Sequence, residues 1–181
     1  MEEMIKFGRK IVESGLAHSH FGNISKRVGD KMLISMTGAM LDELEEAIIE
    51  VPLKGKSSVD VIATTEVDLH RRIYTETSAL AIVHTHSPFA VAASLMFADG
   101  FEPVDCESRL VLHRIPVVSG EVGSAELAEA CAAALRNHKA AIIAGHGPIT
   151  RGQTLDEAFV YACCVEHAAK VLWLLKTANA L

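Results

Sequence analysis

The sequence predicts a mixed α/β domain in which helices cover a central sheet. Segments whose apolar residues follow a helical period alternate with short, strongly apolar runs of strand length. Half of the 181 residues are hydrophobic, so the chain can bury a sizeable core. Neither a linker nor an internal repeat nor a low-complexity stretch divides the chain, and we therefore expect a single domain over residues 1–181.

The first 56 residues are expected to form a helix, a hairpin and a third strand. Helical spacing of apolar residues predicts a helix over residues 2–15, with Gly15 as its stop. Two alternating runs on either side of Gly29 and Asp30 predict a β-hairpin. The stretch TGAMLDELEEA indicates a loop that leads into a short helix, and IIEVPLKGK indicates a strand followed by a turn.

The middle of the chain is expected to hold a buried strand between two helices. The stretch TTEVDLHRRIYTE has a threonine as candidate N-cap and helical spacing at Val67, Ile73 and Tyr74. The apolar run ALAIVHTH predicts the buried strand. A second helix is expected to begin in SPFAVAASLMFA, with Ser87 as its cap and Pro88 in its first turn.

The last third is expected to alternate strands and helices. RIPVV predicts a strand, and SAELAEACAAALRNH predicts a helix capped by Ser124. KAAIIAGHGPIT indicates a strand that Gly-His-Gly interrupts. The remainder predicts one long helix that opens with a capping box from Thr154 to Glu157.

Charge and composition exclude several classes of partner. The net charge is −6 and no run of Lys and Arg occurs, so we expect no nucleic-acid partner. The N-terminus lacks the apolar stretch of a signal peptide, and no segment of about 18 uncharged apolar residues predicts a membrane span. Four cysteines without CxxC spacing are expected to be buried free thiols, which favours a cytoplasmic location.

Three histidines form the candidate metal site. His84 and His86 stand two residues apart at the end of a strand, where both side chains project from one face. Such a pair can chelate a metal or can be ordinary polar residues at a strand end. His146 is the best third ligand, because Gly145 and Gly147 let the backbone bend there and let another group come close.

A carboxylate for acid–base chemistry is offered by Glu66. It follows Thr64 and Thr65 at an expected helix start, where hydroxyls and free N–H groups can bind an anion. A carboxylate there can equally well complement the helix dipole, and both interpretations stay open.

The other histidines are not expected to bind metal. His18 and His20 form a second HxH pair, but they lie in an expected loop that does not hold the two side chains on one face. The remaining four have no partner at ligand spacing and are expected on the surface or partly buried with hydrogen bonds: His70, His113, His138 and His167.

Several motifs together resemble the class II aldolase/adducin family over roughly residues 3–175. These are GNIS, ISMTG, TTE with a following His, VHTHSPFAVA and GHG, in this order and at these separations. The similarity is greatest to short aldolases of the archaeal type that act on L-fuculose 1-phosphate. It implies a three-layer α/β/α fold with a mostly antiparallel or mixed sheet. It also implies assembly as a homotetramer and one Zn²⁺, or another divalent metal ion, per subunit.

The same resemblance assigns roles to particular residues. The metal ligands would be His84, His86 and His146, and the catalytic acid would be Glu66. Because the family's epimerases typically carry aspartate at that position, Glu66 favours carbon–carbon cleavage. The substrate phosphate would be bound by Asn23, Thr37, Gly38, Thr64 and Thr65.

The implied activity is the reversible cleavage of a ketose 1-phosphate to dihydroxyacetone phosphate and a small aldehyde. Glu66 would act as general base on the C1 proton of the ketone fragment. The family's bacterial aldolases donate a proton to the aldehyde oxygen from a tyrosine of a neighbouring subunit; here Glu107 stands near that position, so Glu107 or another group would donate. A dehydratase, a decarboxylase or a pentulose-phosphate 4-epimerase would need the same histidines, and a non-catalytic adducin-like interaction domain would need none of them.

Overall fold

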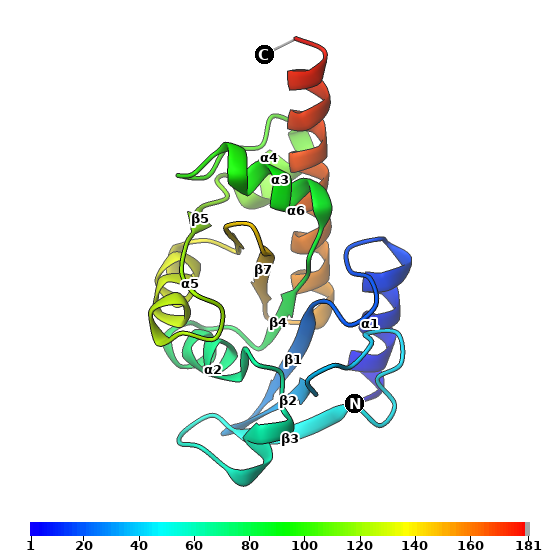
Figure 1. Ribbon diagram of the computed structural model, residues 1–181, viewed down its shortest axis with the longest axis vertical. Helices are drawn as coiled ribbons and strands as arrows, with labels where there is room; N and C mark the ends of the chain where they lie inside the picture. The colour runs from blue at the N-terminus through cyan, green and yellow to red at the C-terminus, as the bar shows by residue number, and fades with distance from the viewer. Residues whose placement is uncertain (180–181) are drawn as a thin grey trace.

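The structure is a computed structural model that describes residues 1–179, so the last two residues of the expected 1–181 domain lie outside it. Within the described residues, seven strands form one mixed sheet and helices cover both of its faces (Figure 1). This three-layer arrangement confirms the predicted fold class.

The sheet is antiparallel except at one edge. Its strands are β1 (Asn23–Val28), β2 (Lys31–Ser35), β3 (Ile48–Pro52), β4 (Ala81–His84), β5 (Val117–Val118), β6 (Ala140–Ile143) and β7 (Gly147–Gly152). They lie in the order β3-β2-β1-β4-β7-β6-β5, and only β5 and β6 run parallel. The pairing places β4 at the centre, between β1 and β7.

The helices divide between the two faces of the sheet. They are α1 (Glu2–Glu13), the 3₁₀ helix η1 (Ser58–Ile62), α2 (Val67–Glu76), α3 (Pro88–Met96), α4 (Cys106–Leu112), α5 (Ala125–Asn137) and α6 (Leu155–Thr177). Figure 1 shows α2 and α5 on one side and α1 and α6 on the other. Successive side chains of a strand point to opposite faces, so Ile82 joins the core of α2 and α5, whereas Ala81 and Val83 join that of α1 and α6.

One face of helix α6 packs into the core of this fold. Its length and composition would also allow it to cross a membrane, with a mean hydropathy of 1.5 in its most apolar window. The sequence analysis predicted no segment that could span a membrane, and α6 departs from that prediction in length and composition. In the structure α6 packs against β4, β7, α3 and α4, and Leu155, Ala162 and Val165 are completely buried there.

Most predicted elements are confirmed, and local signals account for them. The hairpin turns at Gly29 and Asp30. Ser124 caps α5 by accepting a hydrogen bond from the Leu127 amide, and Thr154 caps α6 by accepting one from the Glu157 amide. These interactions span only three residues, so the sequence alone specifies them.

Other local predictions are wrong because tertiary contacts decide the conformation. TGAMLDELEEA forms turns and no helix in the described chain, since Leu41 and Leu44 are buried against α1 at Gly8. Helices η1 and α4 were not predicted. Of the four free cysteines, Cys131 is buried as expected but Cys106 is exposed.

The start of α3 is held by a distant carboxylate. Ser87 occupies the N-cap position, but its hydroxyl donates to the Leu16 carbonyl and makes no cap. Glu166 of α6 accepts hydrogen bonds from the Phe89 and Ala90 amides instead, at 3.1 and 2.8 Å. The segment that follows β4 is thereby tied to α6.

Candidate active site

The structure brings the three predicted histidines together. His84 ends β4, His86 lies two residues later, and His146 lies in the turn between β6 and β7. The three ring centroids are 4.4 to 4.9 Å apart, and each ring offers a nitrogen within 4.8 Å of the others. Because β7 pairs with β4, the turn that carries His146 reaches the end of β4.

Two glycines make this close approach possible. Gly145 has a φ of +68° and turns the backbone before His146. Gly147 lies so close to β4 that a Cβ atom there would be 2.0 Å from the carbonyl oxygen of Thr85. The interpretation of Gly-His-Gly as a bend and a close approach therefore agrees with the geometry, although the motif joins two strands and does not interrupt one.

Replacing Gly147 by Ala is expected to lower the free energy of unfolding by about 2–4 kcal/mol and to weaken metal binding. The new methyl group would clash with backbone, and the φ of +153° is one that L residues rarely adopt. Urea denaturation and metal analysis would measure both effects.

Gly15→Ala is the matched control for this substitution. Gly15 also has a positive φ, +71°, but a Cβ atom there meets nothing within 4 Å. We expect it to cost about 1 kcal/mol. Equal costs at the two positions would show that the contact with Thr85 has no effect of its own.

The histidine nitrogens are arranged as metal ligands. His84 donates from Nδ1 to the Pro148 carbonyl at 3.0 Å, so its Nε2 carries a lone pair. That atom lies 3.1 Å from His86 Nε2 and 3.3 Å from Glu66 Oε2. Among the residues that the structure describes, His146 Nδ1 and Glu66 Oε1 are buried without a hydrogen-bond partner. Converging lone pairs and unpaired acceptors fit a divalent cation.

Burial sets the charge of these groups. It lowers the pKa of His86 to about 3, with a further contribution from His84, and it lowers the pKa of His146 as well. Neutral imidazole is the form that binds metal. Burial opposes ionisation of Glu66, but His84 and the hydrogen bond from Asn23 outweigh it, and the pKa of Glu66 lies below its usual value.

The geometry separates the two interpretations of Glu66. The residue occupies the N-cap position of α2, yet its side chain makes no capping hydrogen bond. The predicted threonine N-cap is wrong, because Glu66 and not a threonine occupies that position. The carboxylate is 3 % exposed, and it accepts from Asn23 Nδ2 at 2.8 Å and faces the histidines. Glu66 is thus an ionised carboxylate inside the histidine site.

A cavity of about 130 Å³ opens beside this cluster. Glu66, His86 and His146 line one part of it. All five residues predicted to bind phosphate also line it: Asn23, Thr37, Gly38, Thr64 and Thr65. The Thr37 amide donates to the Ile62 carbonyl, and the Thr64 amide donates to the Ser35 carbonyl. These bonds hold the segment after β2 against the segment before α2.

Several residues depart from expectation. His20 lines the cavity, and its ring lies 2.7 Å from the Gly38 carbonyl oxygen in a hydrogen bond. No feature of the loop sequence around His20 predicted this position. His70 is completely buried and not near the surface. Glu107 lies exposed on α4 and does not line this cavity in its own chain. Phe21 stacks on His86, with ring centroids 5.1 Å apart.

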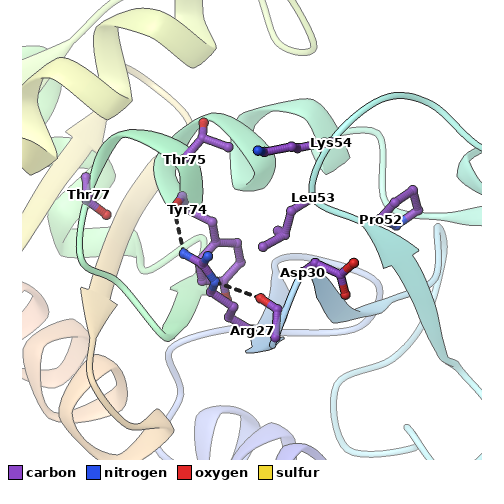
Figure 2. A pocket seen from close by; sticks show the side chains of 9 residues that line it. Arg27, Asp30, Pro52, Leu53, Lys54, Tyr74, Thr75 and Thr77 are labelled. Carbon is purple, nitrogen blue, oxygen red and sulfur yellow. Dashed lines mark hydrogen bonds between the residues drawn. The ribbon is translucent and has the colours of Figure 1, made fainter.

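A larger cavity, of about 670 Å³, lies away from the histidines and is lined by residues such as Arg27, Lys54 and Tyr74 (Figure 2). The Arg27 guanidinium already donates to the carbonyls of Tyr74 and Gly29. Because the converging ligands and the buried carboxylate are all at the smaller cavity, we assign the candidate site there.

Known proteins resemble this chain over most of its length. The family model described as "Class II Aldolase and Adducin N-terminal domain" matches residues 2–173. An L-fuculose phosphate aldolase of Methanocaldococcus jannaschii is 31% identical over 96% of this chain and 95% of its own. A 3-oxo-tetronate 4-phosphate decarboxylase of Pectobacterium atrosepticum is also 31% identical, over 96% of this chain and 83% of its own. The crystal structure of L-fuculose-1-phosphate aldolase from Thermus thermophilus has a TM-score of 0.93 and 30% identity, covering 98% of this chain and 94% of that one.

Proposed function

The chain belongs to the class II aldolase and adducin family and is an enzyme, and we propose that it reversibly cleaves a ketose 1-phosphate. The products would be dihydroxyacetone phosphate and a small aldehyde, as for a substrate like L-fuculose 1-phosphate. The observation that carries this proposal is the buried Glu66 carboxylate, which faces three clustered histidines in a cavity lined by hydroxyl-bearing residues.

The proposed cofactor is one Zn²⁺ per subunit, held by His84, His86 and His146. When bound, such an ion supplies Lewis-acid stabilisation of the negative charge that develops on the substrate oxygens. The unpaired buried His146 Nδ1 supports this assignment.

Glu66 is proposed as the general base. In the condensation direction it removes a proton from C1, the hydroxymethyl carbon of dihydroxyacetone phosphate, and in the cleavage direction it returns that proton. Thr37, Thr64 and Thr65 are proposed to bind the phosphate through hydroxyl and backbone N–H groups at the loop and the start of α2. Asn23 was also predicted to bind the phosphate. Its side-chain nitrogen donates a hydrogen bond to Glu66.

The runner-up is another reaction of the family. The decarboxylase relative is as similar as the aldolase relative, and a dehydratase or an epimerase would use the same histidines. A non-catalytic interaction domain is disfavoured, because it would not need a buried carboxylate that faces them.

The test is a half-reaction. Purified protein loaded with about one Zn²⁺ per chain is expected to exchange one hydrogen at C1 of dihydroxyacetone phosphate with D₂O, without any aldehyde, because this step needs only the base, the metal and the phosphate site. Proton NMR would follow the exchange. Zinc-loaded protein without exchange would contradict the aldolase assignment and leave a decarboxylase or dehydratase.

We further propose that the chain forms a homotetramer. Leu95 on α3 and Leu110 on α4 are 72% and 76% exposed, and Leu95 lies next to Gly145 beside the histidine site. A subunit contact there would also bring a neighbour's residues to the cavity. Light scattering at micromolar concentration is expected to give four times the mass of one chain, and a monomer would contradict the proposal.

A further inference from the structure

A chain of buried hydrogen bonds leads from α2 to Glu66. The Tyr74 hydroxyl lies 2.8 Å from Ser25 Oγ, which lies 2.7 Å from His70 Nδ1. His70 Nε2 lies 2.6 Å from Asn23 Oδ1, and Asn23 Nδ2 lies 2.8 Å from Glu66 Oε2. All five side chains are at most 5 % exposed, so water does not compete for these partners.

The chemistry of the partners fixes the direction of each bond. The Asn23 amide nitrogen can only donate to the Glu66 carboxylate, so its oxygen must face His70 and accept. His70 must therefore carry its proton on Nε2, and Nδ1 accepts from the Ser25 hydroxyl. Burial lowers the pKa of His70 to about 3, which agrees with a neutral ring that carries one proton.

We propose that His70 is a positioning residue for the reaction of Glu66. Through its Nε2–H it holds the Asn23 amide in the orientation that donates to Glu66 Oε2. The second carboxylate oxygen, Oε1, makes no hydrogen bond with the protein and is left for the site. This inference rests on the proposed role of Glu66 as the base.

The orientation matters because the alternative is repulsive. Without a donor at His70, the Asn23 amide can rotate by half a turn and present Oδ1 to the carboxylate. Two acceptors would then face each other in a buried place, and Glu66 would move or lose its ionised state. His70 does not line the cavity, so it can act on the site only through Asn23.

A matched pair of variants tests the donor. In His70→Gln the side-chain amide can reach the place of Nε2 and donate to Asn23, whereas in His70→Asn it reaches only the place of Nδ1. His70→Asn is expected to slow the exchange at saturating dihydroxyacetone phosphate by about 10- to 100-fold, the usual effect of losing a supporting partner, with zinc content unchanged. His70→Gln is expected to recover most of the rate.

Two further measurements separate positioning from a general role in the core. In a Glu66→Gln background, His70→Asn is expected to cause no additional loss, because His70 acts only through Glu66. Tyr74→Phe removes the far end of the chain and keeps the bond from His70 to Asn23, so it is expected to change the rate less than about threefold. An equal loss in His70→Gln, an additive loss in the double variant, or an equal loss in Tyr74→Phe would each overturn the proposal.

The protonation of the His70 ring can also be measured directly, without an activity assay. In zinc-loaded wild type, ¹⁵N NMR of labelled histidine is expected to show a protonated Nε2 and an unprotonated Nδ1 at His70. Exchange in the wild type together with the opposite tautomer would overturn the positioning role alone. Absence of exchange in the wild type would overturn the proposed function, and the inference with it. If His70→Asn does not fold, the tautomer of His70 in the wild type decides, and an unprotonated Nε2 would overturn the proposal.

Discussion

Glu66→Gln is expected to slow hydrogen exchange at C1 of dihydroxyacetone phosphate by about 10²- to 10⁴-fold, the usual contribution of a positioned acid or base. Glutamine has nearly the shape of glutamate and can still accept the hydrogen bond from Asn23, but it cannot take a proton. Since the proposed ligands are histidines, the variant should keep its metal and still bind the phosphate ester.

Glu107→Gln is the control for this substitution. Glu107 does not line the cavity of its own chain, and a donor to the aldehyde oxygen has no part in a half-reaction without aldehyde. It should therefore exchange at the wild-type rate, while its full cleavage rate reports whether it donates. Exchange that survives Glu66→Gln would keep the aldolase assignment and place the base on another residue.

His146→Ala is expected to abolish metal retention and exchange together. Two neighbouring histidines would remain, and a site with two ligands holds zinc far more weakly than one with three. We expect the metal affinity to fall by more than about 10²-fold, since even the loss of a residue that only supports a ligand costs 10- to 100-fold. Metal analysis after dialysis against a chelator, followed by the exchange assay, would measure both losses.

His18→Ala is the matched control, because His18 is exposed in a loop outside the histidine cluster. It should retain both metal and exchange. A His146→Ala variant that keeps a full complement of metal would remove His146 from the ligand set, and the ligand would then have to come from another side chain.

The sequence by itself determined features that depend on near neighbours. The HxH spacing of His84 and His86 predicts two rings on one side of an extended segment, and in the structure His84 ends β4 while His86 follows two residues later. The caps at Ser124 and Thr154 each join atoms three residues apart. The glycines around His146 indicated a bend, because glycine adopts a positive φ at little cost.

Sequence spacing could not show what meets across long loops. His146 reaches the other two histidines only because β7 pairs with β4, and the register of that pairing is a property of the whole sheet. The same holds for the pairing of β1 with β4, which sets Asn23 beside His84 and within reach of Glu66. Spacing alone therefore left both roles of Glu66 open.

Tertiary packing also overruled two local signals. TGAMLDELEEA has a helical pattern, but burying Leu41 and Leu44 against α1 favours turns there. His70 has the spacing of an ordinary helix residue, and only the packing of α2 on β1 buries it between Ser25 and Asn23. In each case burial and hydrogen bonds to residues distant in sequence outweigh local preference, because they remove more apolar surface and satisfy more polar groups than any local contact can.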